Sequence, residues 1–403
     1  MKKDIISKQC EENNTKIIMV VLDGLGDIPS PANDNKTPLE TAKTPNIDKL
    51  APQSAMGRLT PVIDGITPGS GPAHLALFGY DPLEDLIGRG VLEAFGLGVD
   101  VGKNDVAIRA NFCTVGSDGK IEDRRAGRIP TELGQNLCRL LSGKIKSANG
   151  VNVLITPGMS HRFAVVLKGK GLGNKVTDTD PQHEGMLPLK ATGQDAKSKK
   201  TANVANILME KFKVALKDSY PANGVLFRGF SSPPNLISFP ERFNIKAAAI
   251  ATYPMYKGLA QIVGMDIIKS GSTLRDEIEA LKTCYSDFGF FYFHIKETDA
   301  GGEDGDLERK VSGIEKFDKA LPEIMELKPD VLAITGDHST PVIMKRHSWH
   351  PVPVMVLAKD CFRDGLARFT EKNCIVGSIG SVPMLNLMPL LLAHAGRLGK
   401  YGA

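Results

Sequence analysis

The feature that most constrains the fold of this 403-residue chain is an unbroken apolar run that ends in polar residues. Ile17–Leu22 contains no polar side chain and is followed directly by Asp23-Gly24. A continuous, largely β-branched run of this length is typical of a strand that is buried on both faces of a parallel sheet. Runs of the same form recur along the chain, at residues 151–155, 288–295, 331–335 and 352–357.

Helical patterns lie between these runs, for example at residues 274–284 and 307–327. The alternation of strands and helices predicts an α/β domain with a doubly wound sheet. In such sheets, ligands bind beyond the carboxyl ends of the strands. Three of the runs end in polar residues, at Asp23, at His294 and at Asp337-His338. We therefore expect the functional site at this edge of the sheet.

The middle of the chain lacks this pattern and is richer in glycine, lysine and asparagine. We predict that residues 107–244 form a smaller inserted domain, and that residues 1–106 and 245–403 together form one discontinuous domain. Loops are expected at residues 169–175 and 177–200, and the lysines at 197, 199 and 200 are interpreted as the surface of a solvated loop.

Charge and composition exclude several classes of protein. The formal charge of +4 is small beside 50 basic and 46 acidic residues, which argues against a nucleic-acid or membrane partner. The six cysteines are scattered and indicate reduced thiols. The N-terminal segment turns polar where a signal peptide needs an apolar stretch, and the apolar run at 383–395 is too short to span a bilayer. We expect a cytoplasmic protein; the sequence leaves its oligomeric state open.

Ser70 is the candidate nucleophile. It lies between Gly69 and Gly71, ahead of the apolar run at residues 75–78. This arrangement predicts a hydroxyl at the N-terminus of a helix, where backbone N–H groups and the helix dipole favour an anion. The alternative is that the serine only caps the helix.

Carboxylates and imidazoles gather in three further segments. HIKETDAGGEDGDLE contains Asp299, Glu303, Asp304 and Asp306; TGDHSTP contains Asp337 and His338; KRHSWHPVP contains His347 and His350. A solvated acidic turn and structural histidines are the alternatives. With Asp23, these donors suffice for two divalent cations, and mixed carboxylate and imidazole ligands suit Mn²⁺, Co²⁺, Zn²⁺ or Mg²⁺. Paired metals about 4 Å apart recur in enzymes of phosphoryl transfer.

The order of these residues resembles the alkaline phosphatase superfamily. Within it, the chain resembles the archaeal-type cofactor-independent phosphoglycerate mutases, in the segments VLDGLGD, PGSGPAHLALFGYDP, DRRAGRI, YPMYKGLA, HIKETDAGGEDGD, TGDHSTP and HSWHPVP. The resemblance implies an alkaline-phosphatase-like fold, with a doubly wound, mostly parallel sheet and a smaller inserted α+β domain.

The resemblance also implies two metal sites. One would be formed by Asp23, Ser70, Asp337 and His338, and the other by Asp299, Glu303 and His347. His347 takes this role in place of His350. The family pattern has histidine where this chain has Glu303, which leaves the metal preference open. Gly71 also departs from the pattern, because many members carry aspartate there.

The implied reaction interconverts 3-phosphoglycerate and 2-phosphoglycerate through a phosphoserine, without 2,3-bisphosphoglycerate. Arginines suit the carboxylate and phosphate of this substrate, and Arg124, Arg125 and Arg128 lie in the inserted domain. Lys257, His161, Arg162 and Arg228 are weaker candidates, for which a surface ion pair explains the residue equally well. His74 either lines the site or caps the helix.

Two other functions remain open from the sequence. A phosphatase or a phosphopentomutase-like phosphotransferase of the same superfamily would share the metal centre, because the inserted domain determines the substrate. A non-catalytic protein that binds metal or phosphate belongs to a different class. The presence of Ser70 favours an enzyme, since a binding protein needs no nucleophile at that position.

Overall fold

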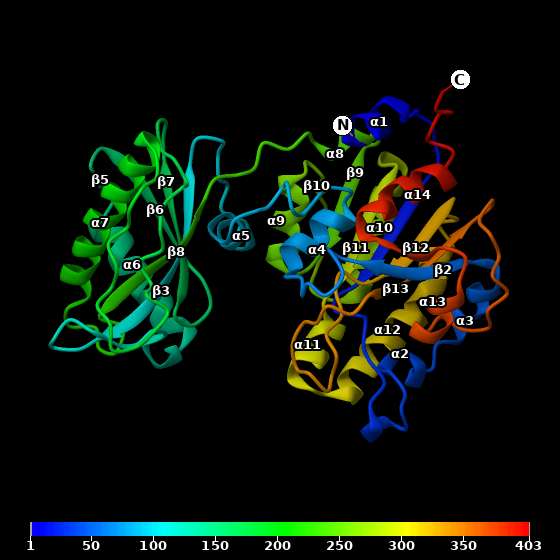
Figure 1. Cartoon of the computed structure of the whole chain (residues 1–403), viewed down its shortest axis with the longest axis horizontal. Coiled ribbons are helices and arrows are strands. Elements are labelled where there is room, and N and C mark those ends of the chain that lie inside the picture. Colours follow the sequence, from blue (N-terminus) through cyan, green and yellow to red (C-terminus); the bar gives the residue numbers. More distant parts are fainter. Residues whose placement is uncertain (1, 403) are drawn as a thin grey trace. The chain divides into compact units, whose positions relative to one another are not determined.

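The computed structural model describes residues 2–402 and divides into two compact units (Figure 1). Unit 1 contains the residues up to Leu86 and those from Leu236 onward, and unit 2 contains Ile87–Asn235. Within the described residues, no helix is long and apolar enough to cross a membrane.

Unit 1 is built on an eight-stranded sheet with the order β10-β9-β11-β1-β12-β13-β2-β14. The strands are β1 (Ile17–Leu22), β2 (Ala55–Thr60), β9 (Ala247–Ala251), β10 (Asp266–Ile267), β11 (Phe290–Ile295), β12 (Val331–Thr335), β13 (Val352–Ala358) and β14 (Gly380–Pro383). β1 pairs in parallel with β11 and β12, and only β13 runs antiparallel to its neighbours. The predicted doubly wound, mostly parallel fold is confirmed.

Helices cover both faces of this sheet. Phe291 and Phe293 of β11 face a core shared with α2 (Pro38–Thr41), α3 (Pro45–Leu50), α10 (Leu274–Cys284) and α12 (Leu307–Met325). Tyr292 faces the other side, where Phe78 packs edge-on against its ring at 4.9 Å. Phe78 ends α4 (Ser70–Leu77), and α9 (Pro254–Ile262) and α14 (Leu387–His394) accompany α4 on this side. The remaining helices are α1 (Lys2–Gln9), α8 (Phe239–Phe243), α11 (Glu297–Asp304) and α13 (Glu371–Val376).

Unit 2 is an α+β unit with an antiparallel sheet. Its strands are β3 (Val106–Val115), β4 (Ile121–Asp123), β5 (Ser147–Ala148), β6 (Val151–Pro157), β7 (Arg162–Lys168) and β8 (Gly224–Ser231). α6 (Thr131–Lys144) and α7 (Ala196–Leu216) share its main core, in which Phe112, Phe163 and Phe212 are buried. α5 (Arg89–Gly96) packs against β3 and β8.

Two local predictions for unit 2 were wrong. The run at 151–155 is not a strand buried in a parallel sheet: β6 is antiparallel, and its Asn152 and Leu154 are exposed. The predicted loop at 177–200 ends early, because Asp195 caps α7 by accepting a hydrogen bond from the Ser198 N–H at 2.8 Å. The lysines at 197, 199 and 200 therefore lie in the first turns of a helix, where Asp195 is a strong N-cap.

The unit boundaries differ from the predicted ones at 106/107 and 244/245. Residues 87–106 belong with unit 2, because α5 lies against its sheet and the Val91 N–H donates to Ser231 Oγ at 2.9 Å. Residues 236–244 belong with unit 1, where Phe239 packs against Phe290 with ring centroids 4.8 Å apart. Neither contact is reflected in the local amino-acid composition, so the sequence alone does not locate the boundaries between the units.

Candidate active site

The candidate site lies at the carboxyl ends of three neighbouring strands of unit 1. Asp23 follows β1, Lys296 follows β11, and Asp337 and His338 follow β12. Because β1 lies between β11 and β12, these polar residues meet at one edge of the sheet. Helix α11, which begins just after β11, adds Asp299.

Among the described residues, two groups of side chains offer metal-ligand atoms within 4.8 Å of one another, and His338 belongs to both. The first group contains Asp23, Asp337 and His338, all fully buried. His338 Nε2 lies 3.1 Å from Asp337 Oδ2 and 3.5 Å from Asp23 Oδ1. The structure thus brings together three of the predicted ligands from strands that are distant in sequence.

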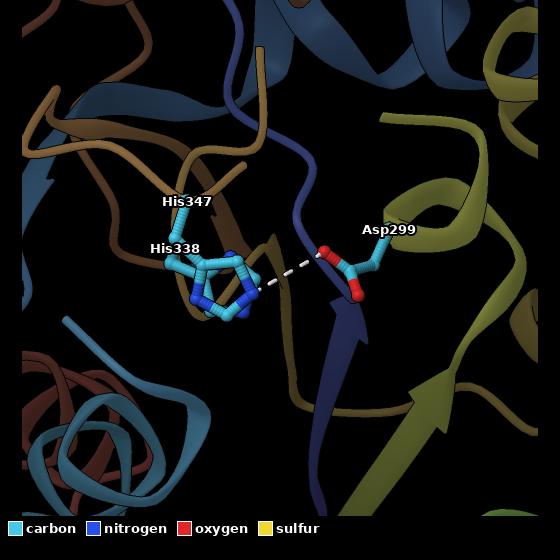
Figure 2. A group of neighbouring side chains, drawn as sticks. All are labelled: Asp299, His338 and His347. Atoms are coloured by element: carbon cyan, nitrogen blue, oxygen red, sulfur yellow. Dashed lines mark ion pairs between the residues drawn. The ribbon is translucent and has the colours of Figure 1, made fainter. Parts of the chain in front are cut away.

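The second group contains Asp299, His338 and His347. The two imidazoles stack with centroids 3.6 Å apart, and His347 Nε2 lies 3.8 Å from Asp299 Oδ1. Figure 2 shows the two overlapping rings and, as a dashed line, the ion pair between His347 and Asp299. Because the His338 ring belongs to both groups, the two candidate cation sites are adjacent.

The electrostatics of the first group fit a divalent cation. Both carboxylate oxygens of Asp23 and Oδ2 of Asp337 are buried without a hydrogen bond. Burial alone raises the pKa of Asp23, but the His294 ring, with Nε2 3.4 Å from Asp23 Oδ2, and the charge of Lys296 hold that pKa well below its usual range. Burial and the charge of Asp23 raise the pKa of Asp337 well above its usual range. The crowding of these two carboxyl groups therefore opposes the ionisation of Asp337, which a divalent cation would favour, and the carboxylate and imidazole donors suit cations of the Mn²⁺ or Zn²⁺ type.

Ser70 is the first residue of α4, and Gly69 is the N-cap. The helix has no side-chain cap, so the serine hydroxyl does not serve as one. Ser70 Oγ instead lies 3.4 Å from His338 Nε2, beside the first group. One turn later, His74 is buried, with Nδ1 2.9 Å from the Ser70 carbonyl oxygen and 3.4 Å from Asp337 Oδ2. Burial lowers the pKa of His74 to about 3, so its ring is neutral at pH 7.

Glu303 lies next to the second group but outside it. Its Oε1 is 3.8 Å from His347 Nε2, and its side chain is 55% exposed. Burial of the carboxyl and the charge of Asp299 raise its pKa. His350 turns away, and its Nδ1 lies 2.9 Å from Ser348 Oγ.

The other acidic residues of this segment have structural partners. Asp304 pairs with Arg309 at 2.6 Å, and Asp306 caps α12 by accepting from the Arg309 N–H at 2.9 Å. Asp299 is thus the residue of the acidic segment that joins a ligand group.

Three side chains of the site were not among the predicted site residues. Lys296 Nζ lies 3.0 Å from Asp23 Oδ2 and also pairs with Asp299. Thr340 Oγ1 donates to Asp299 Oδ1 at 2.7 Å. Tyr256 stacks on His294 with centroids 3.8 Å apart. Lys296 has a sequence signal, since it follows a buried strand, whereas Tyr256 follows β9 and reaches the site only because β9 pairs with β11.

The candidate substrate residues of unit 2 fall into two sets. Arg124 is held by a bidentate pair with the buried Asp180, with distances of 2.8 and 2.7 Å. Arg228 lies 3.5 Å from the same carboxylate and 3.8 Å from Asp178. These two guanidinium groups are already paired within the unit.

The other set surrounds His161, which is buried. Burial and the charges of Arg162, Arg125, Arg109 and Arg128 lower the pKa of His161 to about 4. We call these four arginines the arginine patch. Arg125, Arg128 and Arg162 are exposed, and within the part of the chain that the structure describes none of the three has an ion pair. Lys257 lies in unit 1, where its charge acts on Glu277.

An unusual turn presents two members of the arginine patch. Ala126, Gly127 and Arg128 have φ values of 49°, 65° and 52°, in the left-handed region that non-glycine residues seldom adopt. Asp123 holds the turn by accepting from the N–H groups of Arg125 and Gly127, each at 2.7 Å. Such conformations persist only where surrounding contacts enforce them, and they are frequent at ligand sites.

Comparisons with known proteins agree with this geometry. A family model described as 2,3-bisphosphoglycerate-independent phosphoglycerate mutase matches residues 51–223. A probable 2,3-bisphosphoglycerate-independent phosphoglycerate mutase of Thermotoga neapolitana is 52% identical, over 100% of this chain and 99% of the relative.

Solved structures show the same similarity. A protein of Pyrococcus horikoshii superposes with a TM-score of 0.83 at 29% identity, covering 97% of this chain and 100% of the other. The cofactor-independent phosphoglycerate mutase of Thermoplasma acidophilum gives a TM-score of 0.75 at 32% identity, covering 95% and 100%. Given the full-length match and the site at the strand ends, the chain belongs to the family of 2,3-bisphosphoglycerate-independent phosphoglycerate mutases.

Proposed function

We propose that this chain interconverts 3-phosphoglycerate and 2-phosphoglycerate through a phosphoserine at Ser70. The observation that supports this most directly is the position of Ser70 Oγ, 3.4 Å from His338 Nε2. The hydroxyl adjoins a buried group in which both oxygens of Asp23 and Oδ2 of Asp337 lack hydrogen bonds. A hydroxyl beside a strongly anionic pocket becomes a useful nucleophile when cations occupy that pocket.

Two divalent cations would be held by two sets of residues. The first set is Asp23, Ser70, Asp337 and His338, and the second is Asp299, Glu303 and His347. Mn²⁺, Co²⁺, Zn²⁺ and Mg²⁺ are the candidates, and Glu303 favours the harder ions because it adds a carboxylate where the family pattern has histidine. Bound there, the cations supply Lewis acidity that lowers the pKa of the serine hydroxyl and neutralises charge on the phosphoryl oxygens.

The proposed reaction needs no second phosphate donor, because the substrate's own phosphoryl group is transferred to Ser70 and back. Ser70 Oγ forms a bond to phosphorus as the bond from phosphorus to the C3 oxygen of the substrate breaks, and the serine proton passes to that oxygen. The C2 hydroxyl of the retained glycerate then takes the phosphoryl group from Ser70 and returns a proton to it. Lys296, whose pKa is raised by Asp23 and Asp299 against the effect of burial, remains cationic beside these two carboxylates throughout.

We further propose that the arginine patch binds the carboxylate and phosphate of the substrate. Arg125 and Arg128 are its best candidates, because both are exposed on the left-handed turn and lack an ion pair within the described residues. Guanidinium groups bind such anions through paired hydrogen bonds. Arg124 is a weaker candidate than the sequence predicts, because its Nε and Nη2 already donate to Asp180. As a glycolytic enzyme, the protein would act in the cytoplasm.

The test is a ³¹P NMR assay of 3-phosphoglycerate conversion by chelator-treated protein. We expect no turnover without added metal, recovery with Mn²⁺ or Co²⁺, and no requirement for 2,3-bisphosphoglycerate. Release of inorganic phosphate at the rate of substrate loss would identify a phosphatase. Full activity of protein shown by elemental analysis to be free of metal would contradict the proposal.

A further inference from the structure

Beneath the candidate metal ligands lies a buried lysine that the proposed chemistry does not use. Lys310 of α12 has 0% side-chain exposure. Its Nζ donates to Asp27 Oδ2 at 2.8 Å, to the Thr340 carbonyl oxygen at 2.9 Å and to the Gly26 carbonyl oxygen at 3.2 Å. An ammonium group has three hydrogens, so all of its donors are used.

These acceptors belong to the two loops that carry the first ligand group. Gly26 and Asp27 follow Asp23 after β1, and Thr340 follows His338 after β12. The loops also bond to each other, because the Thr340 N–H donates to the Gly26 carbonyl at 3.0 Å. Asp27 Oδ2 accepts a further bond from the Val342 N–H at 3.1 Å. Lys310 is therefore the central donor of a buried network that joins both loops.

Thr340 connects this network to the ligands. Its hydroxyl donates to Asp299 Oδ1 at 2.7 Å and lies 2.9 Å from His338 Nδ1. The hydroxyl has one hydrogen, which it donates to the carboxylate, so its oxygen must accept a hydrogen bond from the His338 ring. From this pattern we assign the ring hydrogen of His338 to Nδ1. This tautomer leaves the lone pair on Nε2, the atom that faces Asp337 and Ser70.

Close packing by Gly24 and Gly302 fixes the position of Thr340. A Cβ on Gly24 would lie 2.6 Å from Thr340 Oγ1, and a Cβ on Gly302 would lie 2.3 Å from the Thr340 carbonyl oxygen. Glycine at both positions lets the loop after β1 and helix α11 close around this threonine.

We propose that Lys310 is a positioning residue that acts through Thr340, and that together they fix the tautomer of His338 and the orientation of Asp299 for cation binding. The inference rests on the proposed function, since it concerns the same two ligand groups. Hydrogen-bond partners of metal ligands set the ligand's tautomer and orientation, and their loss typically costs 10- to 100-fold in metal affinity.

The experiment is a double-mutant cycle on Mn²⁺ affinity, measured by titration calorimetry on chelator-treated full-length protein. The variants are Lys310→Met, Thr340→Val and the double substitution. We expect each single variant to bind Mn²⁺ about 10- to 100-fold more weakly. The double variant should be no weaker than the weaker single variant, because both changes break one pathway. Thr340→Ser, which keeps the hydroxyl, is the matched control and should bind like the parent.

Thermal unfolding separates positioning from support of the fold. Lys310→Met should lower the Tm, because it leaves Asp27 buried without its partner. Thr340→Val should lower Mn²⁺ affinity with little change in Tm. If Lys310→Met does not fold, Asp27→Asn combined with Lys310→Met removes both charges and takes its place.

Two outcomes would overturn the inference: parental Mn²⁺ affinity in Lys310→Met, or losses that multiply in the double variant. If the parent binds two Mn²⁺ ions and either outcome is seen, this inference fails and the proposed function stands. If the parent binds none of Mn²⁺, Co²⁺, Zn²⁺ and Mg²⁺, both fail.

Discussion

At the residue scale, the site stands out for its unsatisfied polar atoms. Asp23, His74, His294 and Asp337 each have at least one buried side-chain atom without a hydrogen bond. A buried polar group left unpaired costs about 1–3 kcal/mol, and such groups are rare in folded proteins. Because these unpaired atoms gather around Asp23, the region lowers the stability of the folded protein without metal. Bound cations would provide partners for these atoms and stabilise the fold.

Replacing one buried carboxylate therefore has opposite effects on stability and on binding. Asp337→Asn removes the repulsion between two buried carboxylates, so it should raise the Tm of chelator-treated protein. The same variant should gain less Tm than the parent when Mn²⁺ is added, because it has lost a charged ligand. Thermal scans with and without Mn²⁺ measure both effects, and an equal gain in the two proteins would show that Asp337 does not bind the ion.

Glu277 of α10 gives a prediction about pH that is independent of the metal ligands. Burial raises the pKa of its carboxyl to about 8, against the opposing charge of Lys257. The folded state then holds a proton that the unfolded state releases near pH 4.5, so stability is lost as the pH rises from about 4.5 to about 8. The isosteric Glu277→Gln should be more stable than the parent at pH 9 and gain much less at pH 5. Urea unfolding at both values tests this, and a gain independent of pH would be inconsistent with a protonated carboxyl.

At the element scale, local sequence signals placed four of the eight strands of unit 1, namely β1, β11, β12 and β13, and the helices α4, α10 and α12, but not the order of the strands. The run Ile17–Leu22 and the helix Leu274–Cys284 match β1 and α10 because each has an unambiguous periodicity. The run at 352–357 forms β13, and only the pairing with β12 shows that it is antiparallel. Tyr256 joins the site through strand order, which depends on contacts between distant segments and leaves no local pattern.

Two glycines in helices should respond oppositely to the same substitution. Gly302 of α11 has no space for a Cβ, which would lie 2.3 Å from a backbone oxygen, whereas Gly143 of α6 has no atom within 4 Å of that position. Gly143→Ala should stabilise the protein by up to about 0.5–1 kcal/mol, because alanine loses less backbone entropy in a helix. Gly302→Ala should destabilise it and weaken Mn²⁺ binding, since it displaces Thr340. Equal effects in urea unfolding would mean that α11 does not pack closely on the loop after β12.

At the scale of the whole molecule, the sequence predicted the fold class and the clusters of polar residues. Which arginines are available to bind a substrate became clear only from their contacts in the folded protein. Arg124 and Arg125 are adjacent in one motif, yet Asp180 holds the first and leaves the second exposed. Nothing in the order of residues distinguishes them, because Asp180 lies far along the chain. The proposed division of labour, with metals in unit 1 and anion binding in unit 2, therefore needs a functional test.

Substitution of the arginine patch should change the fate of the phosphoryl group. In Arg125→Ala and Arg128→Ala, glycerate is held less tightly, so water competes for the phosphoserine. Formation of 2-phosphoglycerate should fall while release of inorganic phosphate persists or rises. Arg139→Ala, which removes an exposed arginine of α6, is the control and should behave like the parent. If both patch variants keep the parental rate and product ratio, these arginines do not hold the substrate.

The measurement that tests the central claim most directly is the detection of the covalent intermediate. Mn²⁺-loaded protein is mixed with 3-phosphoglycerate in the absence of 2,3-bisphosphoglycerate, quenched in acid within one turnover, digested and analysed by mass spectrometry. The account predicts one phosphate on the peptide that contains Ser70, formation of 2-phosphoglycerate, and loss of both by several orders of magnitude in Ser70→Ala. Formation of 2-phosphoglycerate by Ser70→Ala at the parental rate would contradict it.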